Sequence, residues 1–224
     1  MITICCCWGI QVIVHDRNEV KPSEIGCFPD LKALWSTFPR SIRLHMERVG
    51  KYADVMCRYM AENNIEDMNN RVGQDFLSVS REIFALHDIG RHYIPFALLN
   101  KVGELTPEET EFIRNHTVFA RRAIRSIYQK PYSDDIMQKW EEIAVYHHEC
   151  FDGTGYPRQL RGEDIPLGAR ICAIADAYDG IVSWKPYKKK QTTREEAVEI
   201  IKSEAGKQFQ PELVEVFVKC TVWF

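Results

Sequence analysis

Seven histidines are spread along the 224-residue chain, and four of the residues that could bind a cation form two adjacent pairs. The pairs are His87-Asp88 and His147-His148. Imidazole nitrogens and carboxylate oxygens are ligands that iron, manganese and related divalent ions accept when no thiolate is available. The eight cysteines include no C-x-x-C pair, so the pattern favours a nitrogen and oxygen site over a zinc knuckle.

The histidines that could bind a cation fall on apolar stripes with the spacing of an α-helix. Such a stripe faces a protein core, and a histidine on it is directed towards the same core. A fifth segment, 168–182, is apolar on nearly every side, so Asp176 within it is expected to be buried. The stripes contain His45 in 40–60, His87 in 74–88, His116 beside Phe112 in 107–127, and His147 in 134–148.

Two helix starts can also be located in the sequence. Thr106 and Thr193 each precede a glutamate by three residues, which is the capping-box spacing, and Pro107 occupies a first helical position. No segment alternates apolar and polar residues as a half-buried strand would. We therefore predict an all-α fold, with residues 1–30 as an N-terminal extension and linker and residues 31–224 as one domain.

Histidines on core-facing stripes have two explanations, core packing and metal binding. Burial of a lone carboxylate such as Asp176 is costly, and a buried charge is normally paired or bound to a metal. Donors that converge from several helices form a common type of metal site in helical bundles. We favour metal binding over a coincidence of four core histidines.

Adjacent residues on a helix point about 100° apart, so both members of a pair can serve only a wide site or one beside a helix end. A site with two or more ions satisfies this restriction. Asp88 would bridge two ions through its two oxygens, while His147 and His148 would reach different parts of the cluster. Two bridged metals lower the pKa of a shared water and hold the oxygens of an in-line displacement at phosphorus. The pattern therefore indicates hydrolysis of a phosphate ester.

Three stretches of the sequence carry a family resemblance. They are HDIGRHYIPFALLNKVGELTPEETEFIRNH (87–116), HHECFDGTGYP (147–157) and ARICAIADAYDGIVSWKPYKKK (169–190). In order and spacing they resemble the HD-GYP family of the HD phosphohydrolase superfamily, over about residues 41–217. The resemblance implies a helical HD-domain bundle with a metal site in its core. It also implies a bacterial signalling enzyme that hydrolyses cyclic di-GMP to pGpG, with further cleavage to GMP left open, using two or three iron or manganese ions.

Carried over motif by motif, the resemblance implies a role for each candidate residue. Asp88 and Arg91 would act in catalysis. The substrate would contact Gly155, Tyr156, Lys185 and Lys188. The metal ions would be held by His45, His87, Asp88, His116, His147, His148 and Asp176.

Three positions depart from the family pattern. Arg91 replaces the usual lysine, and an arginine can hold a phosphate but is a poor proton donor. Ser41 stands where the three-metal members have a glutamate, which favours two metal ions over three. Lys185 replaces an arginine and loses its two-donor geometry. These departures support an alternative, a catalytically weak or inactive receptor for cyclic di-GMP or a partner protein. A hydrolase of another cyclic dinucleotide is a further alternative.

Composition limits the partners of the protein. The net charge is −3, which does not favour general binding of DNA or RNA. The apolar stretch at 1–14 is too short to span a bilayer, and the cysteines are expected to be reduced in the cytoplasm. A cyclic dinucleotide is the expected partner, while a homodimer or a signalling protein stays open. Asp179 is expected either to orient a metal ligand or to lie at a helix surface.

Overall fold

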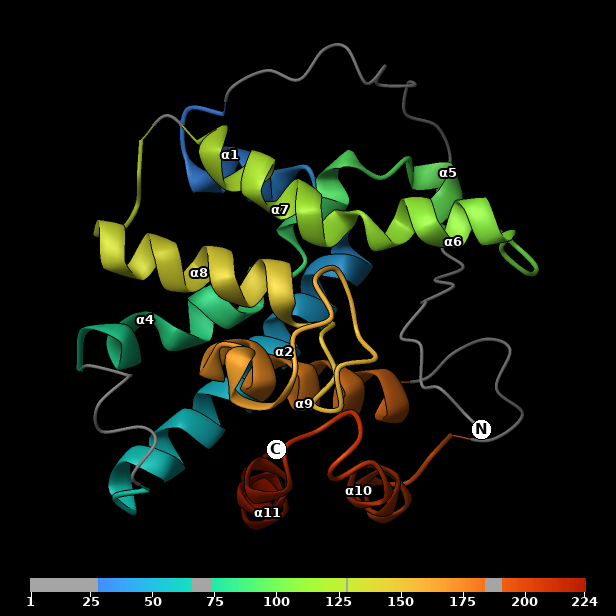
Figure 1. Ribbon diagram of the computed structural model, residues 1–224. Helices are drawn as coiled ribbons and strands as arrows, with labels where there is room; N and C mark the ends of the chain where they lie inside the picture. Colours follow the sequence, from blue (N-terminus) through green and yellow to red (C-terminus); the bar gives the residue numbers. More distant parts are fainter. Residues whose placement is uncertain (1–27, 66–73, 128, 184–190) are drawn as a thin grey trace.

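The computed structural model describes residues 28–65, 74–127, 129–183 and 191–224. Within these residues the only β structure consists of two isolated bridges, Phe28 with Ile127 and Ala205 with Phe209. The remaining regular structure is helical (Figure 1). The predicted all-α fold is therefore confirmed.

The described helices are short apart from α2, and each is given by its bounds. The α-helices are α1 (Leu31–Ser36), α2 (Arg40–Glu62), α4 (Gln74–Ala85), α5 (Phe96–Leu99), α6 (Pro107–Arg114), α7 (His116–Arg125), α8 (Asp134–Tyr146), α9 (Leu167–Val182), α10 (Arg194–Ser203) and α11 (Pro211–Cys220). Three 3-10 turns are η1 (Ile89–Tyr93), η2 (Gly162–Asp164) and η3 (Thr221–Trp223).

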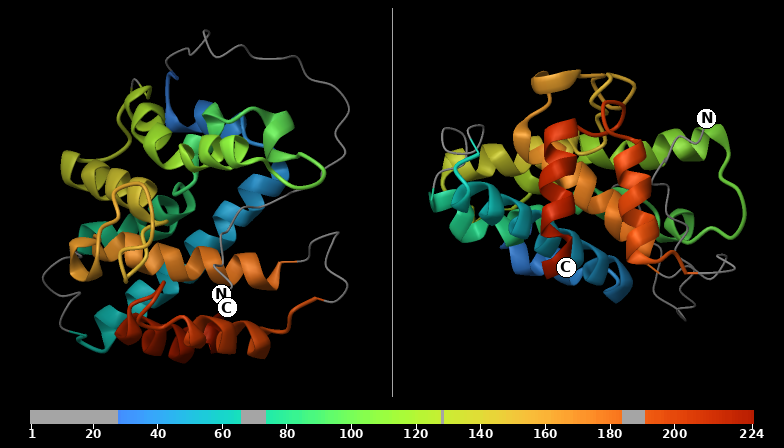
Figure 2. Two further views of the ribbon diagram at one scale, coloured as in Figure 1. Left: turned by 45° about the vertical axis from the view of Figure 1, so that its right-hand side comes forward. Right: turned by 90° about the horizontal axis from the view of Figure 1, so that it is seen from below.

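Helix α9 lies at the centre of the fold. Nearly every residue from Leu167 to Ile181 is buried, as expected for a segment that is apolar on all sides. It packs against α2 and α8 and, on its other side, against α10 and α11 (Figure 1). The last two helices run side by side, as Figure 2 shows from two further directions. Asp176, in the middle of α9, is 1% exposed.

Both predicted capping boxes are present. Thr106 accepts a hydrogen bond from the Glu109 N–H, and the Glu109 carboxylate accepts one from the Thr106 N–H. Thr193 and Glu196 make the same reciprocal pair at the start of α10. These caps satisfy N–H groups that a helix terminus otherwise leaves without partners.

The segment 107–127 is not one helix, which corrects one sequence expectation. Helix α6 ends at Arg114 and α7 begins at His116, with Asn115 between them. The Asn115 side chain donates to the Glu111 carbonyl (3.1 Å), a local bond that competes with helix continuation. Phe112 is 40% exposed while His116 is 1% exposed, so the two residues do not share a buried face.

Two further helices end earlier than the apolar stripes indicate. Helix α4 ends at Ala85 and α8 at Tyr146, so both adjacent donor pairs lie just beyond a helix end. The middle of α8 is tied to the chain just beyond α4, because the Trp140 indole N–H donates to the Leu86 carbonyl (3.3 Å). Beyond a helix end, the backbone can direct two adjacent side chains towards the same place. Within a helix, adjacent side chains point in different directions.

Some expectations fall on residues outside the described ranges. Lys185 and Lys188 lie outside them, as does almost all of the 1–30 extension. The division into an extension and a 31–224 domain stays a prediction. Among the described residues, no helix combines the length and the apolar character that a bilayer crossing requires.

Candidate metal centre and substrate loop

The structure brings together all seven residues predicted to bind metal. They form two groups in which the possible ligand atoms lie within 4.8 Å of one another. The first group comes from helices α2 and α9 and the end of α4. The second group comes from the end of α4, the α6–α7 junction and the end of α8. The first group is His45, His87 and Asp176, and the second is Asp88, His116, His147 and His148.

The Asp88 carboxylate lies between the two groups. Its Oδ2 atom is 3.5 Å from His45 Nε2 and 3.4 Å from His87 Nε2. Its Oδ1 atom is 3.3 Å from His116 Nε2 and 3.8 Å from His147 Nε2. One carboxylate therefore faces both groups, each with a different oxygen. His147 and His148 both belong to the second group, and their binding to different parts of the cluster stays a prediction.

Backbone carbonyls fix the orientation of three imidazole rings. His87 Nδ1 is 2.9 Å from the Phe84 carbonyl oxygen, and His116 Nδ1 is 2.7 Å from that of Ile113. His147 Nδ1 lies 3.1 Å from the Ala144 carbonyl oxygen. Because a carbonyl only accepts hydrogen bonds, each Nδ1 must carry the proton, and the Nε2 lone pair points into the site.

Burial keeps the imidazoles of the second group neutral. It lowers the pKa of His116 to about 4 and that of His148 to about 3, and it lowers the pKa of His147 as well. Burial alone would raise the pKa of Asp88, but the adjacent Arg91 guanidinium, together with the neighbouring His87 and His45 side chains, holds it well below its usual range. At neutral pH this group therefore offers neutral imidazoles and an ionised carboxylate, the forms that bind cations.

The ligand atoms of the second group suit a cation because their lone pairs face one another with no hydrogen-bond donor between them. With the proton on Nδ1, the Nε2 atoms of His116 and His147 carry lone pairs, and both face an Asp88 oxygen. Neither Nε2 makes a hydrogen bond, although both atoms are buried. Buried acceptors without a donor are costly, and a cation between them removes that cost. The residues present therefore fit a divalent metal ion.

The first group has a different electrostatic balance. Burial lowers the pKa of His45, but hydrogen bonds with Asp176, Asp179 and Asp88 outweigh burial and raise the pKa overall. His45 Nε2 is 3.2 Å from Asp176 Oδ1, so a proton there offsets the carboxylate charge. A metal ion in this group would take the place of that proton.

Asp179 holds His45 from the side away from the site. Its Oδ2 atom is 2.8 Å from His45 Nδ1, and it also accepts hydrogen bonds from Arg48. Asp179 is fully buried, so of the two sequence alternatives the structure favours orientation of His45 over a place at the helix surface. His92 belongs to neither group, since its Nδ1 pairs with Thr37 Oγ1 at 3.0 Å.

A close backbone approach joins the 3-10 turn after Asp88 to the second group. A Cβ atom on Gly90 would collide with the carbonyl oxygen of His116, so only glycine fits there. Arg91, in the same turn, is 5% exposed, and its Nε is 2.8 Å from Asp88 Oδ2. The predicted catalytic pair, Asp88 and Arg91, is thus a buried ion pair beside the possible metal ligands.

The loop that follows His148 is anchored by a buried carboxylate. Glu149 is 2% exposed, and its carboxylate accepts hydrogen bonds from the backbone N–H groups of Arg158 (2.6 Å) and Leu160 (3.0 Å). Gly155 packs so closely against Glu149 and Cys150 that a Cβ atom would overlap their backbone. The loop is therefore held at two points on either side of Tyr156, and the Tyr156–Pro157 peptide bond is cis.

Tyr156 contacts the edge of the metal-ligand groups. Its ring stacks on His148 with centroids 4.9 Å apart and planes 24° apart, and the Arg114 guanidinium carbon lies 5.1 Å from its centroid. Neither Arg114 nor Glu149 is among the site residues predicted from the sequence. Each stands next to or near a candidate ligand, but that position alone specifies no contact, because the loop packing decides it.

Comparison with known proteins agrees with this geometry. The HD domain family matches residues 42–213. A cyclic di-GMP phosphodiesterase of Thermotoga maritima is 40% identical over 175 residues, which cover 78% of this chain and 43% of that protein. A 3'3'-cGAMP-specific phosphodiesterase 2 of Vibrio cholerae is 31% identical over 182 residues, which cover 80% of this chain and 31% of that protein.

A solved structure shows the same fold at lower sequence identity. Bd1817, an HDG"Y"P protein from Bdellovibrio bacteriovorus, aligns with a TM-score of 0.55 and 17% identity over 85% of this chain and 57% of that chain. The chain belongs to the HD domain family and is related to the cyclic di-GMP phosphodiesterases of the HD-GYP branch. It spans less than half the length of the two curated relatives.

Proposed function

We propose that the protein is a metal-dependent phosphodiesterase that hydrolyses cyclic di-GMP to linear pGpG, with GMP as a possible second product, in bacterial second-messenger signalling. One observation carries the proposal: the Asp88 carboxylate faces two groups of donors, all buried except the partly buried His148, one group with each oxygen. The identity to a cyclic di-GMP phosphodiesterase supports the choice of substrate. A cytoplasmic location, as the cysteines suggest, remains part of the proposal.

We assign the metal ions to residues as follows. Two ions of iron or manganese would supply a Lewis acid and an activated water for attack on phosphorus. Asp88 would contribute one oxygen to each side of the site. The donor set is His45, His87, Asp88, His116, His147, His148 and Asp176.

The chain's own cation at this centre is Arg91. Its guanidinium has five N–H groups, and only part of that capacity is used by Asp88. In the proposed reaction, Arg91 binds the scissile phosphate and offsets its charge. As a permanent cation it would not protonate the leaving oxygen, so water supplies that proton. Gly155 lets the loop pack tightly, and Tyr156 places the nucleotide. Lys185 and Lys188 are proposed to bind phosphate as well.

A second candidate substrate has specific support. One relative is named for action on 3'3'-cGAMP, and its identity to this chain is not far below that of the cyclic di-GMP relative. A receptor that binds the dinucleotide without cleaving it is the non-enzymatic alternative, supported by Arg91 in place of the family's lysine.

The test is a product assay on protein of known metal content. Protein purified without oxygen is loaded with Mn²⁺ or Fe²⁺, incubated with cyclic di-GMP or 3'3'-cGAMP, and assayed by chromatography. We expect pGpG from cyclic di-GMP and no product after removal of the metal by chelation. Faster cleavage of 3'3'-cGAMP would replace the proposed substrate. Binding without any product at two metal ions per chain would establish the receptor instead.

A further inference from the structure

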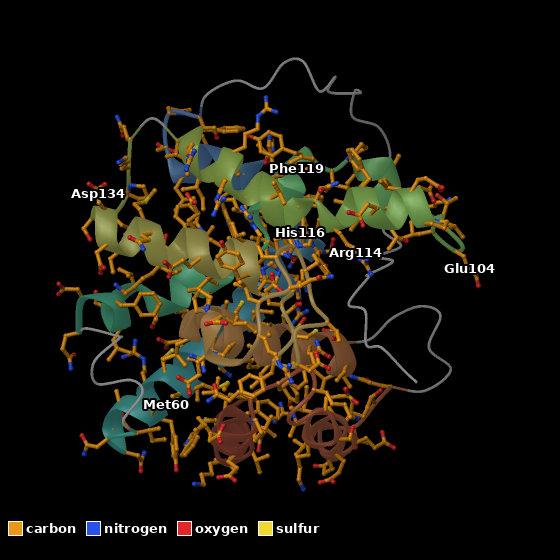
Figure 3. The ribbon with its side chains drawn as sticks, in the orientation of Figure 1. Met60, Glu104, Arg114, His116, Phe119 and Asp134 are labelled. Atoms are coloured by element: carbon orange, nitrogen blue, oxygen red, sulfur yellow. The ribbon has the colours of Figure 1, made fainter. Side chains whose placement is uncertain are left out.

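A second arginine, Arg114, lies at the outer edge of the site and takes no part in the proposed reaction. Arg114 is the last residue of α6 and precedes His116 by two residues. Figure 3 shows both residues on the side of α6 and α7 that faces the middle of the molecule. The Arg114 guanidinium lies over the Tyr156 ring, which itself stacks on His148. A row of three side chains therefore leads outwards from the metal-ligand groups.

The two arginines of the site lie at different depths. Arg91 is 5% exposed and paired with Asp88, while the Arg114 side chain is 40% exposed. A cyclic dinucleotide contains two phosphodiester groups held apart by the ring of the molecule. When one phosphate is at the Asp88–Arg91 centre, the other must lie further out. Arg114 is the described cation that contacts the loop residue next to the centre.

We propose, on the basis of the proposed function, that Arg114 is a substrate-binding residue that holds the second, uncleaved phosphate of the cyclic dinucleotide. The guanidinium carbon lies over the Tyr156 ring, which holds this cation beside the substrate loop. Its Nη1 is also 3.8 Å from Glu111 Oε2, a largely exposed pair that a phosphate would replace. Two parallel donors bind phosphate oxygens more firmly than one ammonium group. Arg114 would thus favour a substrate with two phosphates over a simple phosphodiester.

Direct binding provides a test that needs no turnover. Cyclic di-GMP is titrated into metal-free protein by calorimetry. We expect the affinity for cyclic di-GMP to be about tenfold weaker in Arg114→Ala. The loss should be smaller in Arg114→Lys, which keeps the charge but lacks the two parallel donors of a guanidinium. The matched control is Arg122→Ala. The Arg122 guanidinium makes the same kind of contact, 5.3 Å from the Tyr93 centroid, but belongs to neither donor group nor the substrate loop. The affinity of Arg122→Ala for cyclic di-GMP should stay within about twofold of that of wild type.

Kinetics of the manganese-loaded protein separate this role from general damage. For Arg114→Ala, kcat/KM for cyclic di-GMP should fall about tenfold more than kcat/KM for bis(p-nitrophenyl) phosphate, mainly through KM. Bis(p-nitrophenyl) phosphate has a single phosphate, so it has no second group for Arg114 to hold. If the alanine variant does not fold, Arg114→Gln replaces it in both assays.

The outcomes distinguish the inference from the function on which it rests. If wild type cleaves cyclic di-GMP and the Arg114 variant equals it in affinity and in substrate ratio, the inference is wrong and the function stands. If wild type neither binds nor cleaves any cyclic dinucleotide, both are overturned.

Discussion

Helix α2 contributes to two buried polar clusters that differ in one respect. Towards its C-terminal end, Asp54 accepts hydrogen bonds from the Ser80 hydroxyl and from Arg58 Nε (2.9 Å), so both carboxylate oxygens have a donor. Towards its N-terminal end, His45 joins the Asp88 centre, where imidazole lone pairs face carboxylate oxygens. Each cluster contains a buried carboxylate. At Asp88 Oδ1, however, the lone pairs of His116 and His147 face the carboxylate with no proton between them, and that lack, rather than burial, indicates a cation site.

The largest effect is expected from Asp88→Asn. The amide keeps the shape of the side chain but removes the charge shared by both donor groups. Metal content should fall by at least one ion per chain, and turnover of cyclic di-GMP should fall by more than about a hundredfold. Elemental analysis and the product assay measure the two effects. Full metal content in this variant would contradict the central place of Asp88.

Asp179→Asn should have the next largest effect. Loss of the carboxylate weakens the hold on His45 Nδ1, and metal affinity should fall about 10–100-fold while the fold persists. Competition with a fluorescent chelator measures the affinity. Asp54→Asn is the matched control, because it removes a buried carboxylate from the other cluster. Equal losses in the two variants would mean that general destabilisation explains both.

Glu149→Gln should affect substrate binding more than metal binding. A glutamine offers one acceptor where the Arg158 and Leu160 N–H groups now find two, so the Tyr156 loop should loosen. KM for cyclic di-GMP should rise about threefold to tenfold, with metal content unchanged. Glu163→Gln, on an exposed part of the same loop, is the control. A fall in metal content would instead give Glu149 a role in the metal centre.

The smallest effect on the metal centre is expected from Asp54→Asn itself. Its hydrogen bonds stabilise the fold, and their loss should lower the free energy of unfolding by about 1–3 kcal/mol. Added Mn²⁺ should still raise the Tm of this variant as it does that of wild type, because the ion binds only the folded chain. A chelator titration followed by thermal melts checks this. Loss of the Mn²⁺ effect would mean that the two clusters are coupled.

Helical periodicity predicted much of the fold and the donor set, because core burial fixes which face of a helix a residue takes. It placed His45 on a buried helix face, while the all-round apolar character of 168–182 predicted the burial of Asp176. That these two helices meet is a finding of the structure. Helical periodicity could not predict the break at Asn115, which depends on one local side-chain bond. Nor could it choose between the two places for Asp179, whose partner His45 is 134 positions away. Arg114 and Glu149 were missed because the packing of the loop, and not helical periodicity, decides their contacts.

The carbonyl bonds to the imidazoles bear on the order in which the site assembles. The Nδ1 atoms of His87, His116 and His147 bond to carbonyls three residues earlier, so these rings acquire their direction as soon as the local turns form. His45 instead depends on a distant element, since Asp179 reaches it only when α2 and α9 dock. We therefore expect the ligand side chains to keep their orientation in the apoprotein. Amide hydrogen exchange around these turns should then change little when metal ions bind.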